Sequence, residues 1–293
     1  MSDEAGSAAP ALCRLQLAIE LRALRKAADL SAAAVANQLV VSPSKINRLE
    51  YAENGVVEPA DVMALCTIYG ADDELRDTLI GYATVTKTKK DWWQKRDLAP
   101  AIPPGFKAYL GAEAVGRQAK TYENEYVPGL LQEEGYCHAI LSTQPGRQDE
   151  EEIGKRIAVH MTRQEALHRT ERPLQLDAIM NEAVLRRRVG GRQVMRKQLE
   201  HIVDLASLGT VRIQVVPFEL GAHPGMNGSF TILRFGEDVP FQPVVYLENL
   251  ADNWLLRKQA ETARYEQAFT DLQTAAPGHN ESVKMIEEAI KEH

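Results

Sequence analysis

The chain has 293 residues, of which 44% are hydrophobic and 26% charged, and its formal net charge is −7. These proportions are typical of globular proteins and exclude a collagen-like or wholly disordered chain, and the length favours two domains. Phosphate contacts need lysine and arginine, so the net charge taken alone disfavours a nucleic-acid partner. That charge is a sum over the whole chain. The distribution of charge along the chain therefore says more about binding partners than the total does.

Several protein classes are excluded by local patterns. No stretch approaches the ~20 apolar residues of a membrane span, and the N-terminus carries Asp3 and Glu4 where a secretory signal carries bases. Three cysteines, Cys13, Cys66 and Cys137, form no CxxC pair, which favours free thiols in a reducing compartment. We therefore expect a cytoplasmic protein without membrane contact, metal or cofactor.

The N-terminal segment is predicted to be all-α. We expect residues 1–11 to be disordered and residues 12–85 to form five short helices, because apolar residues recur at helical spacing in each. Ser31 and Ser42 are candidate N-caps of the second and third helices. Only a short connection, residues 40–42, separates those two helices, which is typical of a helix-turn-helix.

Charge is unevenly distributed within this segment. Residues 14–48 hold six basic and two acidic residues, a net charge of +4, whereas residues 49–85 hold one basic and eight acidic residues, a net charge of −7. The basic half contains the third helix, which would be the recognition helix. Its net charge therefore favours DNA at the place where the motif would need it.

The candidate DNA-binding residues lie at the N-terminal part of the third helix, which meets base edges in the major groove in this docking mode. Lysine and arginine can pair with guanine, and asparagine with adenine. The candidates are Ser42, Ser44, Lys45, Asn47 and Arg48. The alternative is that Lys45 and Arg48 only form a solvated face. Since one domain of this size reads one half-site, we expect a homodimer on half-sites about 34 Å apart.

The segments LRALRKAADLS and LVVSPSKINRLEYAENG, followed by a Pro-led helix, resemble the Xre-type (lambda-repressor-like) DNA-binding domain over residues 14–84. The resemblance implies that Glu50 pairs with Arg22 or Arg25 to lock the first helix to the third. Two positions depart from the family pattern. Ala32 stands where these domains usually carry glutamine, and Val40 where they usually carry the glycine of the turn.

Residues 86–105 are predicted to be a linker, since they contain a proline cluster and a net charge of +3. We interpret the Trp92-Trp93 pair as an anchor that holds the linker on one of the domains. The basic residues of the linker are a second candidate for phosphate contacts.

Residues 106–293 are predicted to form an α+β domain with a sheet of about four strands. Strands are expected from residue 174, over 211–218, over 229–235 and over 244–250, and helices over 111–124, up to 141, over 150–169, 193–208, 255–275 and 281–292.

The segments YVPGLLQEEGY, LQLDAIMNEAVLRRRVGGRQVMRKQLEHIVDLA, VRIQVVPFELGAHPGMNGSFTILRF and VVYLENL resemble, in order and spacing, the large C-terminal domain of actinobacterial WhiJ-like regulators. The match covers roughly residues 92–275. It implies an antitoxin-like transcriptional regulator, often encoded beside a small partner protein, and it carries over no catalytic residues.

Two surfaces of this domain are candidates for binding. The loop 221–228, with His223 and Asn227, is either a hairpin-type turn or the lip of a ligand or partner site. Residues 155–201 hold eleven basic and five acidic residues, a net charge of +6. This stretch is a solvated face, a site for a small acidic partner protein, or a second contact with DNA.

Catalytic motifs such as HExxH, GxSxG, a P-loop or GxGxxG do not occur. Asp177, Glu182 and His223 could in principle form a hydrolase, but such residues are more often caps and turns. We predict a sequence-specific DNA-binding transcriptional regulator, not an enzyme, whose C-terminal domain senses a partner protein or ligand. One alternative is an antitoxin-like module that sequesters a small partner and autoregulates, and another is an enzyme tethered to DNA.

Overall fold

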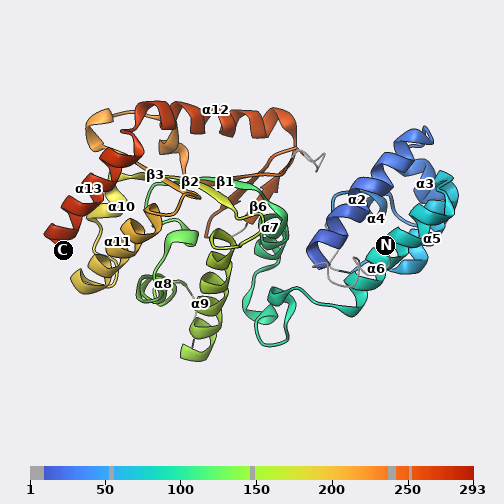
Figure 1. Cartoon of the computed structure of the whole chain (residues 1–293), viewed down its shortest axis with the longest axis horizontal. Helices are drawn as coiled ribbons and strands as arrows, with labels where there is room; N and C mark the ends of the chain where they lie inside the picture. Colours follow the sequence, from blue (N-terminus) through green and yellow to red (C-terminus); the bar gives the residue numbers. More distant parts are fainter. Residues whose placement is uncertain (1–9, 53–55, 146–148, 237–241, 251–252) are drawn as a thin grey trace. The chain divides into compact units, whose positions relative to one another are not determined.

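A computed structural model of the chain describes residues 10–52, 56–145, 149–236, 242–250 and 253–293 (Figure 1). The chain divides into two compact units between Arg96 and Asp97. The first unit is helical and the second contains a mixed sheet, as the sequence predicted. Within the described residues, no helix combines the length and the apolar character that a membrane crossing requires.

The first unit contains five helices in the described residues, α2 (Pro10–Ala27), α3 (Ala32–Leu39), α4 (Pro43–Glu50), α5 (Pro59–Tyr69) and α6 (Asp73–Thr88). Their apolar faces meet in one core, whose most deeply buried side chains include Leu21, Val35, Ile46, Val62 and Leu79. The helix α2 includes residues 10 and 11, which we expected to be disordered; residues 1–9 of that expectation lie outside the described residues.

The expected linker begins within helix α6, which continues to Thr88, and then packs back onto the first unit. Asp91 accepts a hydrogen bond from the Ala11 amide (3.0 Å) and pairs with Arg14 (2.5 Å) in a buried contact. The short 3-10 helix η1 (Trp92–Gln94) follows, with Trp93 buried and Trp92 edge-on against it. Asp91 thus ties this segment to α2, and the burial of Trp93 supports the interpretation of the tryptophan pair as an anchor.

The second unit is built on a six-stranded sheet in the order β3-β2-β1-β4-β5-β6. Its strands are β1 (Gln118–Glu123), β2 (Gln175–Asn181), β3 (Val211–Val216), β4 (Phe230–Arg234), β5 (Val244–Glu248) and β6 (Asn253–Leu256). Strands β1, β2 and β3 are parallel, whereas β4, β5 and β6 are joined by antiparallel pairings. The sheet is larger than the four strands predicted, because β1 falls within a predicted helix and the last two residues of β6 were assigned to the start of another.

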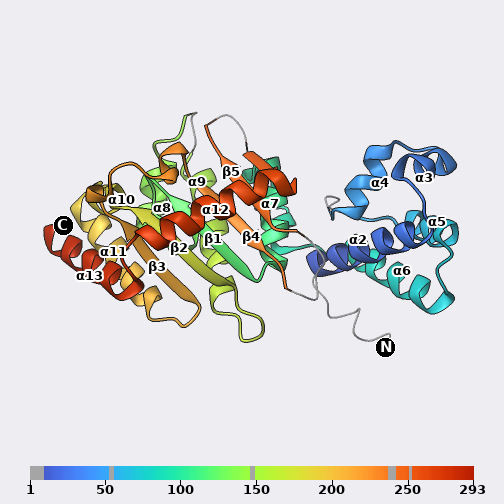
Figure 2. The same ribbon diagram turned by 90° about the horizontal axis from the view of Figure 1, so that it is seen from above.

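Helices cover both faces of this sheet. They are α7 (Pro104–Val115), α8 (Glu134–Leu141), α9 (Glu150–Gln164), α10 (Glu182–Arg186), α11 (Arg192–Ala206), α12 (Gln259–Ala275) and α13 (His279–Glu292), with 3-10 turns η2 (Ala99–Ala101), η3 (Gly129–Leu131), η4 (Glu165–Leu167), η5 (Phe218–Leu220) and η6 (Pro224–Asn227). Helix α12 crosses one face, and α7, α8, α11 and α13 contribute to the core on the other face (Figure 2).

Two expectations about this unit were wrong. The predicted helix over 111–124 ends at Val115, and residues 118–123 form the strand β1 in the middle of the sheet. The segment between β3 and β4 is not a hairpin turn, because β2 and β1 lie between those strands. It is a crossing connection that contains η5 and η6.

Candidate nucleic-acid interface

Local capping determines where the two helices of the helix-turn-helix begin. The Ser31 hydroxyl accepts a hydrogen bond from the Ala34 amide (3.1 Å) at the start of α3, and the Ser42 hydroxyl accepts one from the Lys45 amide (3.3 Å) at the start of α4. Pro43 occupies the first turn of α4, where its missing N–H leaves no bond unmade. Ser42 therefore caps its own helix and still has a hydroxyl proton to donate.

The turn between the two helices is conformationally strained. Val40 has φ 55° and ψ 45°, in the left-handed region that glycine adopts most easily, and its side chain is 91% exposed. The turn is closed by the Val41 amide, which donates to the Ala36 carbonyl (2.9 Å). Valine thus occupies a glycine position without burying any side chain in return.

Helix α4 presents one polar face to solvent. Ser44, Asn47 and Arg48 are exposed, whereas Ile46 and Leu49 are buried in the core of the first unit. Residues three and four apart lie on the same side of a helix, so these three polar side chains share one face. The structure thus brings them together at the surface of α4, where the sequence analysis expected DNA contacts.

Lys45 is partly neutralised by Asp61, a neighbour that no local sequence pattern indicates. Its ammonium lies 2.8 Å from the carboxylate of Asp61 in α5, and both side chains are about one-third exposed. Asp61 follows Lys45 by 16 residues in the sequence. It lies in the first turn of α5, and this is the only local feature that fixes its position. Asp61 lies beside the candidate interface, where its negative charge would repel phosphate. The pair with Lys45 reduces this repulsion.

A bidentate ion pair holds α4 against α2. Arg25 donates to both carboxylate oxygens of Glu50, at 2.6 and 2.7 Å, and also to the Leu30 carbonyl (2.7 Å). The hydrogen bond to Glu50 raises the pKa of Arg25. Glu50 thus pairs with Arg25, whereas Arg22 lies over the Tyr51 ring, 5.0 Å from its centre. This pair fixes the orientation of α4 relative to α2. It lies on the buried side of α4 and leaves the exposed face of the helix free.

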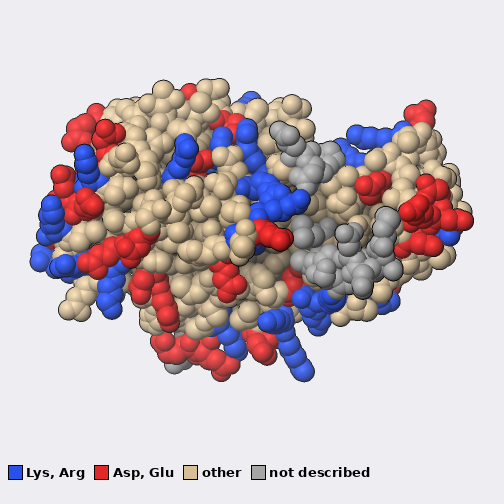
Figure 3. Space-filling model, viewed as in Figure 1, with Lys and Arg blue, Asp and Glu red and all other residues tan. Residues whose placement is uncertain are grey.

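Acidic side chains gather on one part of the first unit (Figure 3). Asp72 caps α6, and Asp73 and Glu74 lie in its first turn. Carboxylates at a helix N-terminus interact favourably with the helix dipole. Part of the acidic charge of residues 49–85 therefore stabilises α6 and lies outside α4.

In the second unit, the loop 221–228 is fastened to the sheet. Gly225 is buried against the ring of Tyr122, and a Cβ at this position would overlap that ring. His223 lies edge-on to Tyr122 and its Nε2 is 3.4 Å from Nδ2 of Asn181. Asn227 donates to the Pro224 carbonyl (3.1 Å), which is a turn contact. Of the two candidate residues, His223 faces the end of the sheet and Asn227 stabilises the loop itself.

Comparison with known protein families finds two matches along the chain. Residues 16–79 match a helix-turn-helix domain model, which contains the Ser31–Ser42 caps and the face of α4 described above. Residues 106–288 match the model of a domain of unknown function, DUF5753, and this match covers more than half of the chain. The chain belongs to the DUF5753 family. No curated protein and no solved structure matches it.

Two of the candidate acid–base residues of the DUF5753 domain, Asp177 and Glu182, lie apart. Asp177 lies in the amino-terminal half of β2, and Glu182 follows the carboxyl end of that strand. Glu182 accepts hydrogen bonds from the Phe218 amide (3.0 Å) and from Arg186 (2.9 Å). Among the described residues, no cluster of histidine, cysteine and acidic side chains could hold a metal ion.

The basic stretch 155–201 of the DUF5753 domain is spread over several helices. Arg163 is buried between Glu113 and Tyr109, Arg186 pairs with Glu182 and Glu292, and Arg187 pairs with Glu125. Lys155 and Arg196 pair with carboxylates of their own helices. Many of these cations are thus neutralised within the domain, so the stretch offers less net charge to a partner than its sequence suggests.

Proposed function

We propose that this protein is a sequence-specific transcriptional regulator that reads the major groove of DNA with helix α4. The observation that carries the proposal is the exposed face of Ser44, Asn47 and Arg48 on a helix whose other side is locked to α2 by the Arg25–Glu50 pair. A recognition helix needs both a polar reading face and a fixed orientation.

Each side chain of this face has a role that its chemistry supports. Asn47 can make a bidentate contact with adenine, and Arg48 can bind guanine or a phosphate. Ser42 and Ser44 can donate to phosphate oxygens beside the helix N-terminus. Lys45 is paired with Asp61, so its contribution to phosphate binding is reduced by that ion pair.

A homodimer fits this function best, because a single helix-turn-helix reads only one half-site. Two copies would bind half-sites about 34 Å apart, one helical turn of DNA. In this proposal the DUF5753 domain senses a ligand or partner protein that binds the DNA-competent and DNA-incompetent states with different affinity.

A second function, binding of a small partner protein in an antitoxin-like manner, is favoured by one observation. Phe218 and Met226, beside and within the fastened loop of the DUF5753 domain, expose 57% and 68% of their surface. Phenylalanine and methionine are enriched at protein–protein interfaces. A stoichiometric partner that co-purifies with the chain, and is lost in Phe218→Ser/Met226→Ser, would support this function.

The main test is selection of DNA fragments from a genomic library, followed by footprinting with the full chain. Arg48→Ala and Asn47→Ala are expected to abolish protection or to weaken binding at least tenfold at the selected site. Arg76→Ala is the matched control, since it removes the same charge from α6, outside the face of α4. The proposal fails if the wild-type chain protects no site, or if Arg48→Ala and Arg76→Ala weaken binding equally.

A further inference from the structure

One face of the sheet in the DUF5753 domain changes character along its strands. Towards the carboxyl end of β1, the rings of Tyr122 and Phe230 and the side chain of Ile179 pack under Phe269 of α12. Towards the amino end of β1, polar and charged side chains occupy the same face. Helix α12 thus covers an apolar half of this face and leaves a polar half beside it.

The polar half consists of two rows that run across neighbouring strands. In the first row Lys120 of β1 is in register with Asp177 of β2, which is in register with Arg212 of β3. In the second row Gln118 of β1 is in register with both Gln175 of β2 and Arg234 of β4. Side chains two residues apart in a strand share a face, and neighbouring strands lie about 4.8 Å apart. These six residues, Gln118, Lys120, Gln175, Asp177, Arg212 and Arg234, are called the polar array below.

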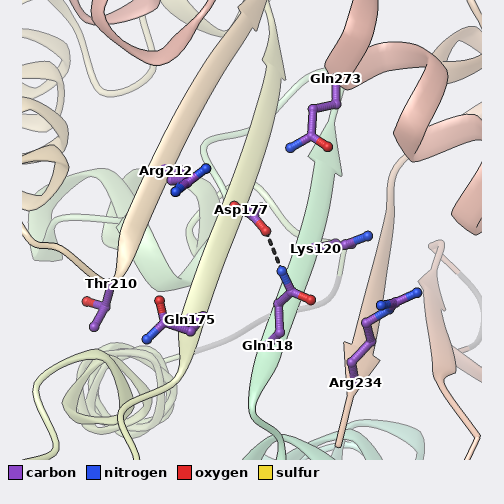
Figure 4. A pocket seen from close by; sticks show the side chains of 8 residues that line it. All are labelled: Gln118, Lys120, Gln175, Asp177, Thr210, Arg212, Arg234 and Gln273. Carbon is purple, nitrogen blue, oxygen red and sulfur yellow. Dashed lines mark hydrogen bonds between the residues drawn. The ribbon is translucent and has the colours of Figure 1, made fainter.

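The polar array is the floor of an open pocket of about 400 Å³, which is also lined by Thr210 and by Gln273 of α12 (Figure 4). This volume lies in the range of small-molecule sites. Because most of its walls are amides and charged groups, the cavity suits a hydrophilic molecule that can accept hydrogen bonds, not an apolar one.

The charge of the array is positive. Three cations and one carboxylate line the cavity, and that carboxylate, Asp177, already accepts a hydrogen bond from the Gln118 amide (2.6 Å). Lys120 and Arg234 share the single carboxylate of Glu266 on α12, at 3.2 and 2.6 Å. Arg212 has no ion pair within the described part of the chain. Positive charge is therefore left uncompensated where hydrogen-bond donors converge.

A solvated sheet surface does not explain the placement of Lys120, although Gln175, Arg212 and Arg234 are exposed. The side chain of Lys120 is only 14% exposed and stands on a central strand. Taking a charge out of water costs free energy, and an apolar residue at this position would avoid that cost. The pair with Glu266 offsets part of this cost, and functional sites are one place where such costs are retained.

We propose that the polar array is the binding site for a small organic anion, a hydrophilic molecule with a phosphate or carboxylate group. Arg212 and Lys120 hold the anionic group, and Gln175 and Gln273 donate hydrogen bonds to the rest of the molecule. Binding of this anion is the signal that the DUF5753 domain passes to DNA binding, and this last step rests on the proposed function above.

The test is calorimetric titration of the full chain with pyrophosphate, citrate and glucose 6-phosphate at constant ionic strength, with sodium chloride as the blank. The wild-type chain is expected to bind at least one of them in a saturable manner, and the three probes distinguish phosphate from carboxylate recognition. Arg212→Gln, on an exposed position of an edge strand, should weaken binding about tenfold or more. Arg192→Gln, which removes an exposed arginine from α11, is the matched control and should bind like the wild type.

Asp177→Asn gives a second test of opposite sign, because removing the carboxylate should tighten anion binding several-fold. A variant that merely damaged the fold would weaken it. Absence of saturable binding to all three probes, or equal binding by Arg212→Gln and the wild type, would overturn the proposal. Footprinting with and without the bound probe then tests the regulatory step. Loss of DNA binding in both conditions would count against the proposed function and leave the binding site standing.

Discussion

The ammonium group of Lys45 lies 2.8 Å from the carboxylate of Asp61, which joins the candidate recognition helix α4 to α5. Both side chains are about one-third exposed, so the pair is worth at most about 1 kcal/mol. A DNA phosphate can therefore compete for Lys45, but it must also approach the Asp61 carboxylate.

We predict that Asp61→Asn strengthens DNA binding up to about tenfold at low salt, because it releases Lys45 and removes a repulsive charge. The logarithm of the binding constant should also fall more steeply with the logarithm of salt, by about 0.9 per additional phosphate contact. Fluorescence anisotropy over a salt series measures both quantities. Asp77→Asn, an exposed acid of α6, is the control, and equal or weaker binding by Asp61→Asn would contradict the prediction.

The strained turn gives a prediction about stability. The left-handed conformation costs a residue with a Cβ roughly 1–2 kcal/mol, and Val40 buries almost nothing in return. Glycine relieves this strain but adds about 0.5–1 kcal/mol of backbone entropy to lose on folding. We expect Val40→Gly to stabilise the helix-turn-helix by about 0.5–1 kcal/mol, seen as slower hydrogen exchange of amides in α3 and α4. Val40→Ala retains a Cβ and should change exchange less; faster exchange in Val40→Gly would contradict the argument.

The helices of the first unit could be predicted because their signals are local. Ser31, Ser42 and Pro43 cap or begin helices through contacts within four residues. The partner of Lys45 could not be predicted, because Asp61 lies on another helix and only the packing of α5 against the rest of the unit brings it near. In the sequence, the strained Val40 is marked only by its departure from a family pattern.

The sheet was harder to predict, because its central strand is polar on one side. In β1, Gln118 and Lys120 alternate with Ala119 and Thr121, so the strand has neither an apolar run nor a strong β-branched pattern. The same feature concealed the polar array. Its rows exist only once β1, β2, β3 and β4 are in register, and no segment by itself shows that the charges of four strands will lie together.

The attachment of the loop 221–228 can be tested at Gly225, which is buried against the Tyr122 ring. We expect Gly225→Ala to destabilise the second unit by about 1–3 kcal/mol, because the added methyl group must displace a packed ring. Urea denaturation measures this change. Gly209→Ala is the matched control, since a Cβ at that position meets nothing within 4 Å. Equal stability of the two variants would show that the loop moves aside without cost.

The last prediction concerns pH and the carboxyl end of β1. Burial raises the pKa of Glu123 to about 7, against the opposing effect of a hydrogen bond with Ser229. A folded-state pKa above the unfolded value of 4.5 means that the folded chain binds the proton more tightly. The stabilising effect is therefore present below pH 4.5 and is lost as the pH rises through 7.

Glu123→Gln removes this titration, so its stability relative to the wild type should rise between pH 4.5 and 7 and level off above. At pH 8 the free energy of unfolding of Glu123→Gln relative to the wild type should exceed its value at pH 4 by up to about 3 kcal/mol, since one pKa unit corresponds to about 1.36 kcal/mol. Urea denaturation of both chains at several pH values measures the difference, and the other titrating groups cancel in it. Glu219→Gln, an exposed glutamate of η5, should show no such trend. A difference for Glu123→Gln that is independent of pH would mean that the Glu123 carboxylate is solvated in the folded protein.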